Sequence, residues 1–220
     1  MYLYLYNSAN KDTLHGKEQE NRSGFSERLV RKALQDYFEK EKPEIPKEVL
    51  REAVIERTEK GKPFFTGLQA AGQEGTPAVH FSVSHSGDWW GCLMAAESVG
   101  FDLEVIREKV NYEKIARRFF TEDECELILT NGADAFFDVW VRKEAYVKYL
   151  GSGLAEGLDS FSVVEKGCLP PQVLSGKNRT ENHLPCYVRT IEIGNGVKGA
   201  YCSGSGNPVK KIYTLEGCNE

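Results

Sequence analysis

The hydrophobic positions of this chain follow two periods, and each period predicts a different kind of element. Apolar and polar residues alternate in residues 79–84 (VHFSVS) and 101–105 (FDLEV), and tyrosine alternates with leucine in residues 2–6 (YLYLY). This two-residue period is that of a β-strand. An apolar segment between 79–84 and 101–105, after a turn at 86–88, completes three successive strands. Further strands are predicted at Ser160–Val164, Cys186–Ile193, Val197–Cys202 and Lys211–Thr214.

Helical periodicity separates these strands. An amphipathic helix is expected to begin between Ser23 and Ser26, and a second covers residues 112–120. Thr121 with Glu124 three residues later forms a capping-box signal for a third helix. A fourth covers residues 136–150 and ends at Gly-Ser-Gly, while a segment with two prolines after the first helix is predicted to be a connector. Blocks of helix and antiparallel strand predict an α+β fold with two halves that meet near residue 98.

Composition narrows the class of protein. The 220 residues carry a formal charge of −5, which argues against a general binder of nucleic acids or of acidic membranes. The first residues lack the features of a signal peptide, and no apolar run approaches the length of a membrane span. The six cysteines have no CxxC spacing, so reduced thiols and a cytoplasmic location are expected.

The helix at 136–150 places charge on an apolar face. At about 100° per residue, one broad face contains Trp140, Lys143, Glu144, Val147 and Lys148. A Glu–Lys pair along the helix would explain Glu144 and Lys148 as ordinary surface groups, and an Asp138–Arg142 pair is expected on the opposite side. Burying charge without a partner costs several kcal/mol, however, so this face is predicted to meet a charged ligand.

Other polar groups have an ordinary interpretation and a functional one. Asp102 and Glu104 share one face of a strand, either as its solvated side or as oxygen ligands for Mg²⁺ or Mn²⁺. Ser84-His85-Ser86 ends a strand without the motif of a serine hydrolase, so these residues are either structural or hydrogen-bond donors to a phosphate. Arg22-Ser23, at the first helix, and Lys62-Pro63, in the connector, are either solvated surface or anion contacts.

Taken in order along the chain, these stretches resemble the 4′-phosphopantetheinyl transferases of the surfactin type. The family has a V/I-G-I/V-D-x-E stretch, here VGFDLE (residues 99–104), followed by W-S/C-x-K-E-A/S-x-x-K, here WVRKEAYVK (residues 140–148). The further stretches GKPFF, HFSVSHSGDWW, ARRFFTEDE, GSGL and LDSFSV also occur in the expected order. Phe101 and Val141 depart from the family pattern: Phe101 is a change in the core, and Val141, which is expected to point away from the ligand face, should have little effect.

The resemblance implies transfer of the phosphopantetheine arm of coenzyme A to a serine of an apo acyl or peptidyl carrier protein, with release of adenosine 3′,5′-bisphosphate. It implies a Mg²⁺ site, with Mn²⁺ as an alternative, made by Asp102, Glu104 and Glu144. Glu144 would also be the base, and Lys143 and Lys148 would lie near the diphosphate. The expected coenzyme A contacts are Arg22, Ser23, Lys62, Pro63, Ser84, His85, Asp102 and Lys148.

The same resemblance implies a monomer in which two α+β halves, 1–98 and 99–220, are related by pseudo-two-fold symmetry and enclose the active site in a cleft. The segment between the first strand and first helix is shorter than in the family, so Lys11 or Lys17 is expected to replace basic contacts there. The alternative function is a non-catalytic module of the same fold that binds coenzyme A or a carrier protein. Retention of Asp102, Glu104, Glu144 and Lys148 together disfavours that alternative.

Overall fold

The computed structural model describes residues 1–10, 22–68, 79–107, 109–153, 157–175, 186–194 and 196–216, and shows an α+β fold. Its helices are α1 (Arg22–Glu41), α2 (Lys47–Glu52), α3 (Tyr112–Phe119), α4 (Glu122–Asn131) and α5 (Ala133–Leu150), with 3₁₀ turns η1 (Ser8–Asn10) and η3 (Leu158–Ser160). Its strands are β1 (Tyr2–Asn7), β2 (Val54–Arg57), β3 (Pro63–Thr66), β4 (His80–Ser86), β5 (Trp89–Ala95), β6 (Val99–Val105), β7 (Phe161–Ser162), β8 (Leu174–Ser175), β9 (Tyr187–Gly194), β10 (Val197–Ser203) and β11 (Lys211–Thr214). No described helix is both long enough and apolar enough to cross a membrane.

The first sheet has the strand order β11-β1-β5-β4. In β1, the alternation of tyrosine and leucine places the two kinds of side chain on opposite faces of this sheet. Tyr4 and Tyr6 belong to the core formed with α1, whereas Leu3 and Leu5 belong to a core shared with the second sheet. The apolar stripe of α1 packs against the tyrosine side. The strand and helix predicted from these periods are therefore confirmed.

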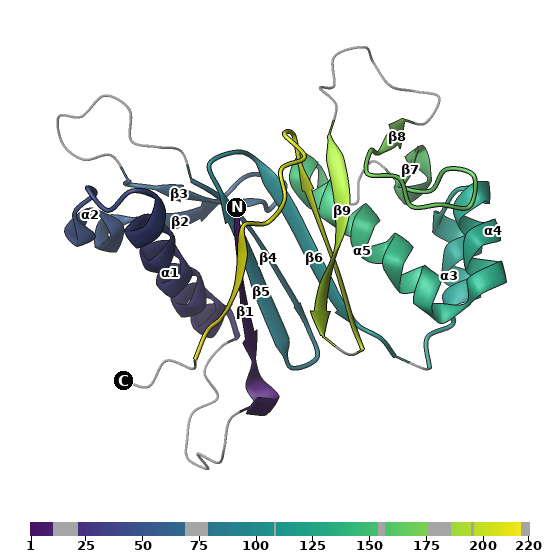
Figure 1. The fold of residues 1–220 in the computed structure, drawn as a ribbon, viewed down its shortest axis with the longest axis horizontal. Helices are drawn as coiled ribbons and strands as arrows, with labels where there is room; N and C mark the ends of the chain where they lie inside the picture. Colours follow the sequence, from purple (N-terminus) through teal and green to yellow (C-terminus); the bar gives the residue numbers. More distant parts are fainter. Residues whose placement is uncertain are drawn as a thin grey trace.

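The second sheet has the order β6-β10-β9, and α5 packs against β6, β10 and β9. Figure 1 shows the resulting layers, with α1 on one outer side, the two sheets in the middle and α5 on the other outer side. Helices α3 and α4 lie beyond α5, and the core on this side contains residues of all three helices. The predicted capping box forms: the Thr121 amide donates to Glu124 Oε2 at 3.0 Å.

Strands β4 and β6 bring the two sheets together through serine side chains. Ser82 Oγ accepts a hydrogen bond from the Phe101 amide at 2.9 Å, and Ser86 Oγ accepts one from the Val105 amide at 3.1 Å. Figure 1 shows the two strands side by side at the middle of the molecule. The serines of the HFSVSHS stretch thus satisfy backbone groups of β6 that a neighbouring strand would normally pair.

The structure differs from the sequence-based expectations in three segments. The proline-containing connector forms α2, with Pro46 as its N-cap, and is followed by the β2–β3 hairpin. The strand expected at Ser160–Val164 contracts to β7, because residues 158–160 form a 3₁₀ turn instead. Strand β11 pairs in parallel with β1, so the end of the chain returns to the first sheet and a single division at residue 98 does not separate the sheets.

Gly100 is the residue that allows β6 to pack directly on the backbone of α5. A Cβ atom at this position would lie 2.0 Å from the Ala145 carbonyl oxygen and 2.4 Å from the Tyr149 amide nitrogen. Both neighbours are helix backbone, so neither can move away by changing a rotamer. Any side chain here would displace β6, and with it Asp102, relative to α5.

We therefore expect Gly100→Ala to lower the free energy of unfolding by about 1–3 kcal/mol, the usual range for overpacking a core. Gly24→Ala is a matched control, because a Cβ there meets nothing within 4 Å and alanine is favoured over glycine in a helix. Urea unfolding monitored by tryptophan fluorescence measures both changes. Equal stability of the two variants would contradict the close approach of β6 and α5.

Candidate active site

A cleft of about 1060 Å³ lies between the β2–β3 hairpin, the first sheet and α5. Six of the residues predicted for the site line it: Lys62, Pro63, Ser84, His85, Glu144 and Lys148. They come from three separate elements, since the hairpin supplies the first two, β4 the next two and α5 the last two. The fold therefore brings together residues that lie far apart in the sequence.

Asp102 and Glu104 do not line this cleft; Asp102 is 4% exposed and contacts two residues that do. Its Oδ1 accepts hydrogen bonds from Lys148 Nζ at 2.7 Å and from Ser84 Oγ at 2.6 Å. Its Oδ2 is buried and has no hydrogen-bond partner. A buried carboxylate oxygen without a donor is costly unless a ligand supplies the missing positive charge.

Glu104 and Glu144 are electrostatically coupled to Asp102. Burial raises the pKa of Glu144, and the negative charges of Asp102 and Glu104 raise it further, while Lys148 opposes the change. Burial also raises the pKa of Glu104, whose Oε2 accepts a hydrogen bond from Ser86 Oγ at 2.5 Å. As they stand, no three His, Cys, Asp or Glu side chains of the described residues are close enough to hold a metal ion.

Lys62 joins the hairpin to the end of α5. Its Nζ donates to the Tyr149 carbonyl oxygen at 2.7 Å and to Ser98 Oγ at 3.0 Å. Burial lowers the pKa of this lysine. The ammonium group is thus largely committed to protein oxygens, and the side chain connects the hairpin to the C-terminal end of α5.

Comparisons with known proteins identify the family of this chain. A sequence model of the 4′-phosphopantetheinyl transferase superfamily matches residues 98–202, which include Asp102, Glu104, Glu144 and Lys148. The chain is 31% identical over 193 residues to the 4′-phosphopantetheinyl transferase Sfp of Bacillus subtilis (strain 168), covering 85% of this chain and 75% of that protein. The chain belongs to the 4′-phosphopantetheinyl transferase superfamily.

Other members of the superfamily match over different lengths. The 4′-phosphopantetheinyl transferase gsp of Aneurinibacillus migulanus is 29% identical over 206 residues, covering 90% of this chain and 76% of that protein. The 4′-phosphopantetheinyl transferase AcpT of Salmonella typhi is 38% identical over 98 residues, covering 42% of this chain and 47% of that protein. The long matches to Sfp and gsp confirm the resemblance to the surfactin-type branch.

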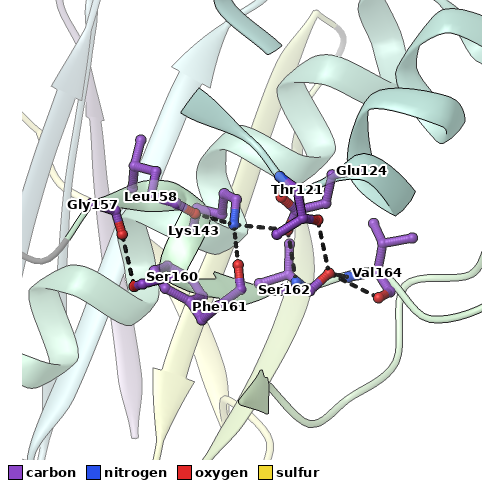
Figure 2. A network of polar contacts seen from close by, with 10 residues as sticks. Thr121, Glu124, Lys143, Gly157, Leu158, Ser160, Phe161, Ser162 and Val164 are labelled. Atoms are coloured by element: carbon purple, nitrogen blue, oxygen red, sulfur yellow. Dashed lines mark hydrogen bonds and ion pairs between the residues drawn. The ribbon is translucent and has the colours of Figure 1, made fainter. Parts of the chain in front are cut away.

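The family motif in α5 contains one residue whose predicted role the structure contradicts. Lys143 is fully buried and points away from the cleft, and its Nζ lies 2.8 Å from Glu124 Oε1. It also donates to the carbonyl oxygens of Leu158 and Phe161, each at 2.7 Å, and lies over the Phe161 ring (Figure 2). The prediction that Lys143 contacts the diphosphate is therefore wrong for this arrangement, in which its charge stabilises the α4–α5–η3 region.

A second correction concerns the opposite side of α5. Arg142 is 2% exposed, and its guanidinium donates to the Pro170 carbonyl oxygen and to Thr190 Oγ1. Asp138 pairs with Lys198 at 3.1 Å, so the expected surface pair between Asp138 and Arg142 does not form. The helix is buried on nearly every side, and Val141, also fully buried, packs in the core as its apolar side chain favours.

The sequence-based site omitted two residues that line the cleft and includes two whose side chains lie outside the described part of the structure. Ser86, predicted with Ser84 and His85 as a possible phosphate contact, donates to Glu104 Oε2 instead. Arg57 and Lys60 line the cleft but stood in a segment predicted to be a connector. Arg22 and Ser23 belong to the first turn of α1, but their side chains are not described, and Lys11 and Lys17 lie outside the described residues.

Proposed function

We propose that this chain transfers the 4′-phosphopantetheine arm of coenzyme A to a serine of an apo carrier protein and releases adenosine 3′,5′-bisphosphate. The observation that carries the proposal is the buried Oδ2 of Asp102, which has no hydrogen-bond partner; Asp102 lies beside Lys148 and is electrostatically coupled to Glu144, and both of these residues line a large cleft. The names of the relatives Sfp and gsp support the same activity.

The residues fit a divalent cation by their chemistry. Asp102, Glu104 and Glu144 would hold Mg²⁺, or Mn²⁺, because both ions prefer oxygen ligands. A cation would also offset the burial and the mutual repulsion that raise the pKa values of the two glutamates. Such an ion, when bound, neutralises charge on the diphosphate of the substrate.

The protein's own groups supply the remaining functions. Lys148 places a positive charge at the cleft, held by Asp102 Oδ1 at 2.7 Å and the Val83 carbonyl oxygen at 3.3 Å. Glu144 accepts the proton of the carrier serine, directly or through a water. The serine oxygen forms a bond to the phosphorus that bears pantetheine, and the bond from that phosphorus to the bridging oxygen of the diphosphate breaks. Ser84 and His85 line the cleft; the Ser84 hydroxyl donates to Asp102, and His85 would donate to the nucleotide end.

We further propose that the active form is a cytoplasmic monomer in which halves 1–98 and 99–220 are related by pseudo-two-fold symmetry, apart from the crossing of β11. Support comes from the order of the layers, in which each sheet carries its helices on its outer side. Among the described residues no cysteine is in a disulfide, in keeping with a reducing compartment.

Intact mass measurement of an apo acyl or peptidyl carrier protein tests the proposed function. The carrier should gain the mass of the phosphopantetheine arm when incubated with the purified chain, coenzyme A and Mg²⁺. Chelation of the divalent cation should stop the gain, and added Mg²⁺ should restore it. Tight binding of coenzyme A with no transfer to any of several carriers would instead support a non-catalytic binding module.

A further inference from the structure

Three serines on one face of β4 lie in the contact between the two sheets. Ser82, Ser84 and Ser86 are each no more than 5% exposed, and each has a hydrogen-bond partner on β6. The partner of Ser82 is a backbone amide, whereas Ser84 and Ser86 donate to side-chain carboxylates. These carboxylates belong to Asp102 and Glu104, so hydroxyl groups of the first sheet hold two of the three residues proposed to bind the cation.

The two carboxylates are not held equally. Asp102 Oδ1 accepts hydrogen bonds from Ser84 and from Lys148, so it keeps one donor if the other is lost. Glu104 Oε2 accepts its hydrogen bond from Ser86 Oγ at 2.5 Å, and no second donor to this carboxylate occurs among the described residues. The terminal torsion of a glutamate side chain has only a broad preference. The single contact with Ser86 therefore decides how the Glu104 carboxylate is oriented.

The hydroxyl proton of Ser86 has one acceptor left to it. A serine hydroxyl has one proton and two lone pairs. The Val105 amide donates to Ser86 Oγ at 3.1 Å, and Arg107 Nη2 donates to the same oxygen at 3.4 Å. Because two N–H groups occupy the lone pairs, the proton points to Glu104 Oε2. Val105 follows Glu104 directly in the chain, so the strand that carries the carboxylate also fixes the hydroxyl that orients it.

The part of the cleft lining that the structure describes does not include Ser86, so this serine acts on the reaction through another residue. We propose that Ser86 is a positioning residue, which holds Oε2 of Glu104 so that the carboxylate is oriented for the divalent cation. This inference rests on the proposed function, because it concerns the cation of that reaction. Groups that hydrogen-bond to a metal ligand orient it, and their loss commonly weakens metal binding.

Ser86→Ala tests this role, and Ser82→Ala is its matched control. Each variant loses a buried hydroxyl of β4 and a hydrogen bond from a backbone amide of β6, but only Ser86→Ala releases a carboxylate. The full chain is titrated with Mn²⁺, which takes the same oxygen ligands as Mg²⁺, and the electron paramagnetic resonance signal reports the free ion. Ser86→Ala should bind Mn²⁺ about 10- to 100-fold more weakly than the wild type, and Ser82→Ala should bind it as the wild type does.

The dependence of transfer on Mg²⁺ concentration gives a second measurement. Ser86→Ala should need correspondingly more Mg²⁺ for half-maximal transfer, and its rate at saturating Mg²⁺ should approach that of the wild type, because the loss is one of cation binding. Equal weakening of Mn²⁺ binding in both variants, or none in Ser86→Ala, would overturn the positioning role while the proposed function stands.

The wild type separates the remaining outcomes. A wild-type protein that transfers the arm but binds no Mn²⁺ would overturn the carboxylate site for the cation, and the role of Ser86 with it. A wild-type protein that transfers no arm to any carrier would overturn the proposed function.

Discussion

Glu144→Gln is expected to reduce transfer of the phosphopantetheine arm by at least about 100-fold, the lower end of the range for losing a general base. The substitution keeps the size of the side chain but removes both the proton acceptor and one carboxylate of the proposed cation site. A second effect, which needs no carrier protein, should accompany the loss of transfer. Mg²⁺ should raise the melting temperature of the wild type and raise that of the variant much less. Intact mass and thermal unfolding measure the two effects.

The variant should also be at least as stable as the wild type when no divalent cation is present. Burial and the charges of Asp102 and Glu104 raise the pKa of Glu144, so its ionised form is disfavoured in the folded protein. A raised carboxyl pKa means that stability declines as the pH rises and the group ionises, and neutral glutamine removes that decline. Glu27→Gln, on α1 and paired with Arg31, is a control in the same cleft that should keep transfer. Substantial transfer by Glu144→Gln would show that this carboxylate is neither base nor ligand.

Lys143→Met is expected to lower the free energy of unfolding by about 3–5 kcal/mol, because it leaves Glu124 buried without its charge partner. Glu124→Gln should cost less, since the amides of Thr121 and Val163 lose charge-assisted bonds but Lys143 keeps its two carbonyl partners. The double variant Lys143→Met/Glu124→Gln should be more stable than the sum of the single losses predicts. Urea unfolding of the four proteins gives the coupling between the two residues.

This cycle decides between the two roles considered for Lys143. A structural role predicts a large stability loss with coupling to Glu124, together with an unchanged Michaelis constant for coenzyme A in the folded fraction. A diphosphate contact predicts the reverse, a raised Michaelis constant with little change in stability. The second result would contradict the buried network of Figure 2.

The error at Lys143 shows what a helical pattern can and cannot predict. Consecutive helical residues point about 100° apart, so Lys143 and Glu144 cannot both face the centre of one cleft. The pattern located one buried side of α5 but contained no information on the burial of the opposite side or on which neighbour covers each part of the helix. That neighbour, Glu124, was interpreted only as a helix cap, and its second oxygen is the one that meets Lys143.

Local patterns were sufficient wherever packing follows the chain period. The alternation in residues 101–105 placed Asp102 and Glu104 on the strand face that meets β4, and the tyrosine–leucine alternation assigned both faces of β1. Helix α2 and the β2–β3 hairpin were missed because they are short and only partly buried. Such elements owe their form to tertiary contacts, such as that of Lys62 with α5, which no window of the sequence contains.

The pairing of β11 with β1 makes the second sheet and its helices an insertion, in topological terms, within the first sheet. The chain enters this insertion after β5 and leaves it before β11, so both of its ends are anchored on strands of one neighbouring body. Unfolding the inserted part alone would leave a long loop still closed by the β1–β11 ladder, and a closed loop gains less chain entropy than a free tail. The two parts of the chain that form the walls of the cleft are therefore connected to each other at two points. This double connection favours unfolding of both parts in a single cooperative step over unfolding of either part alone.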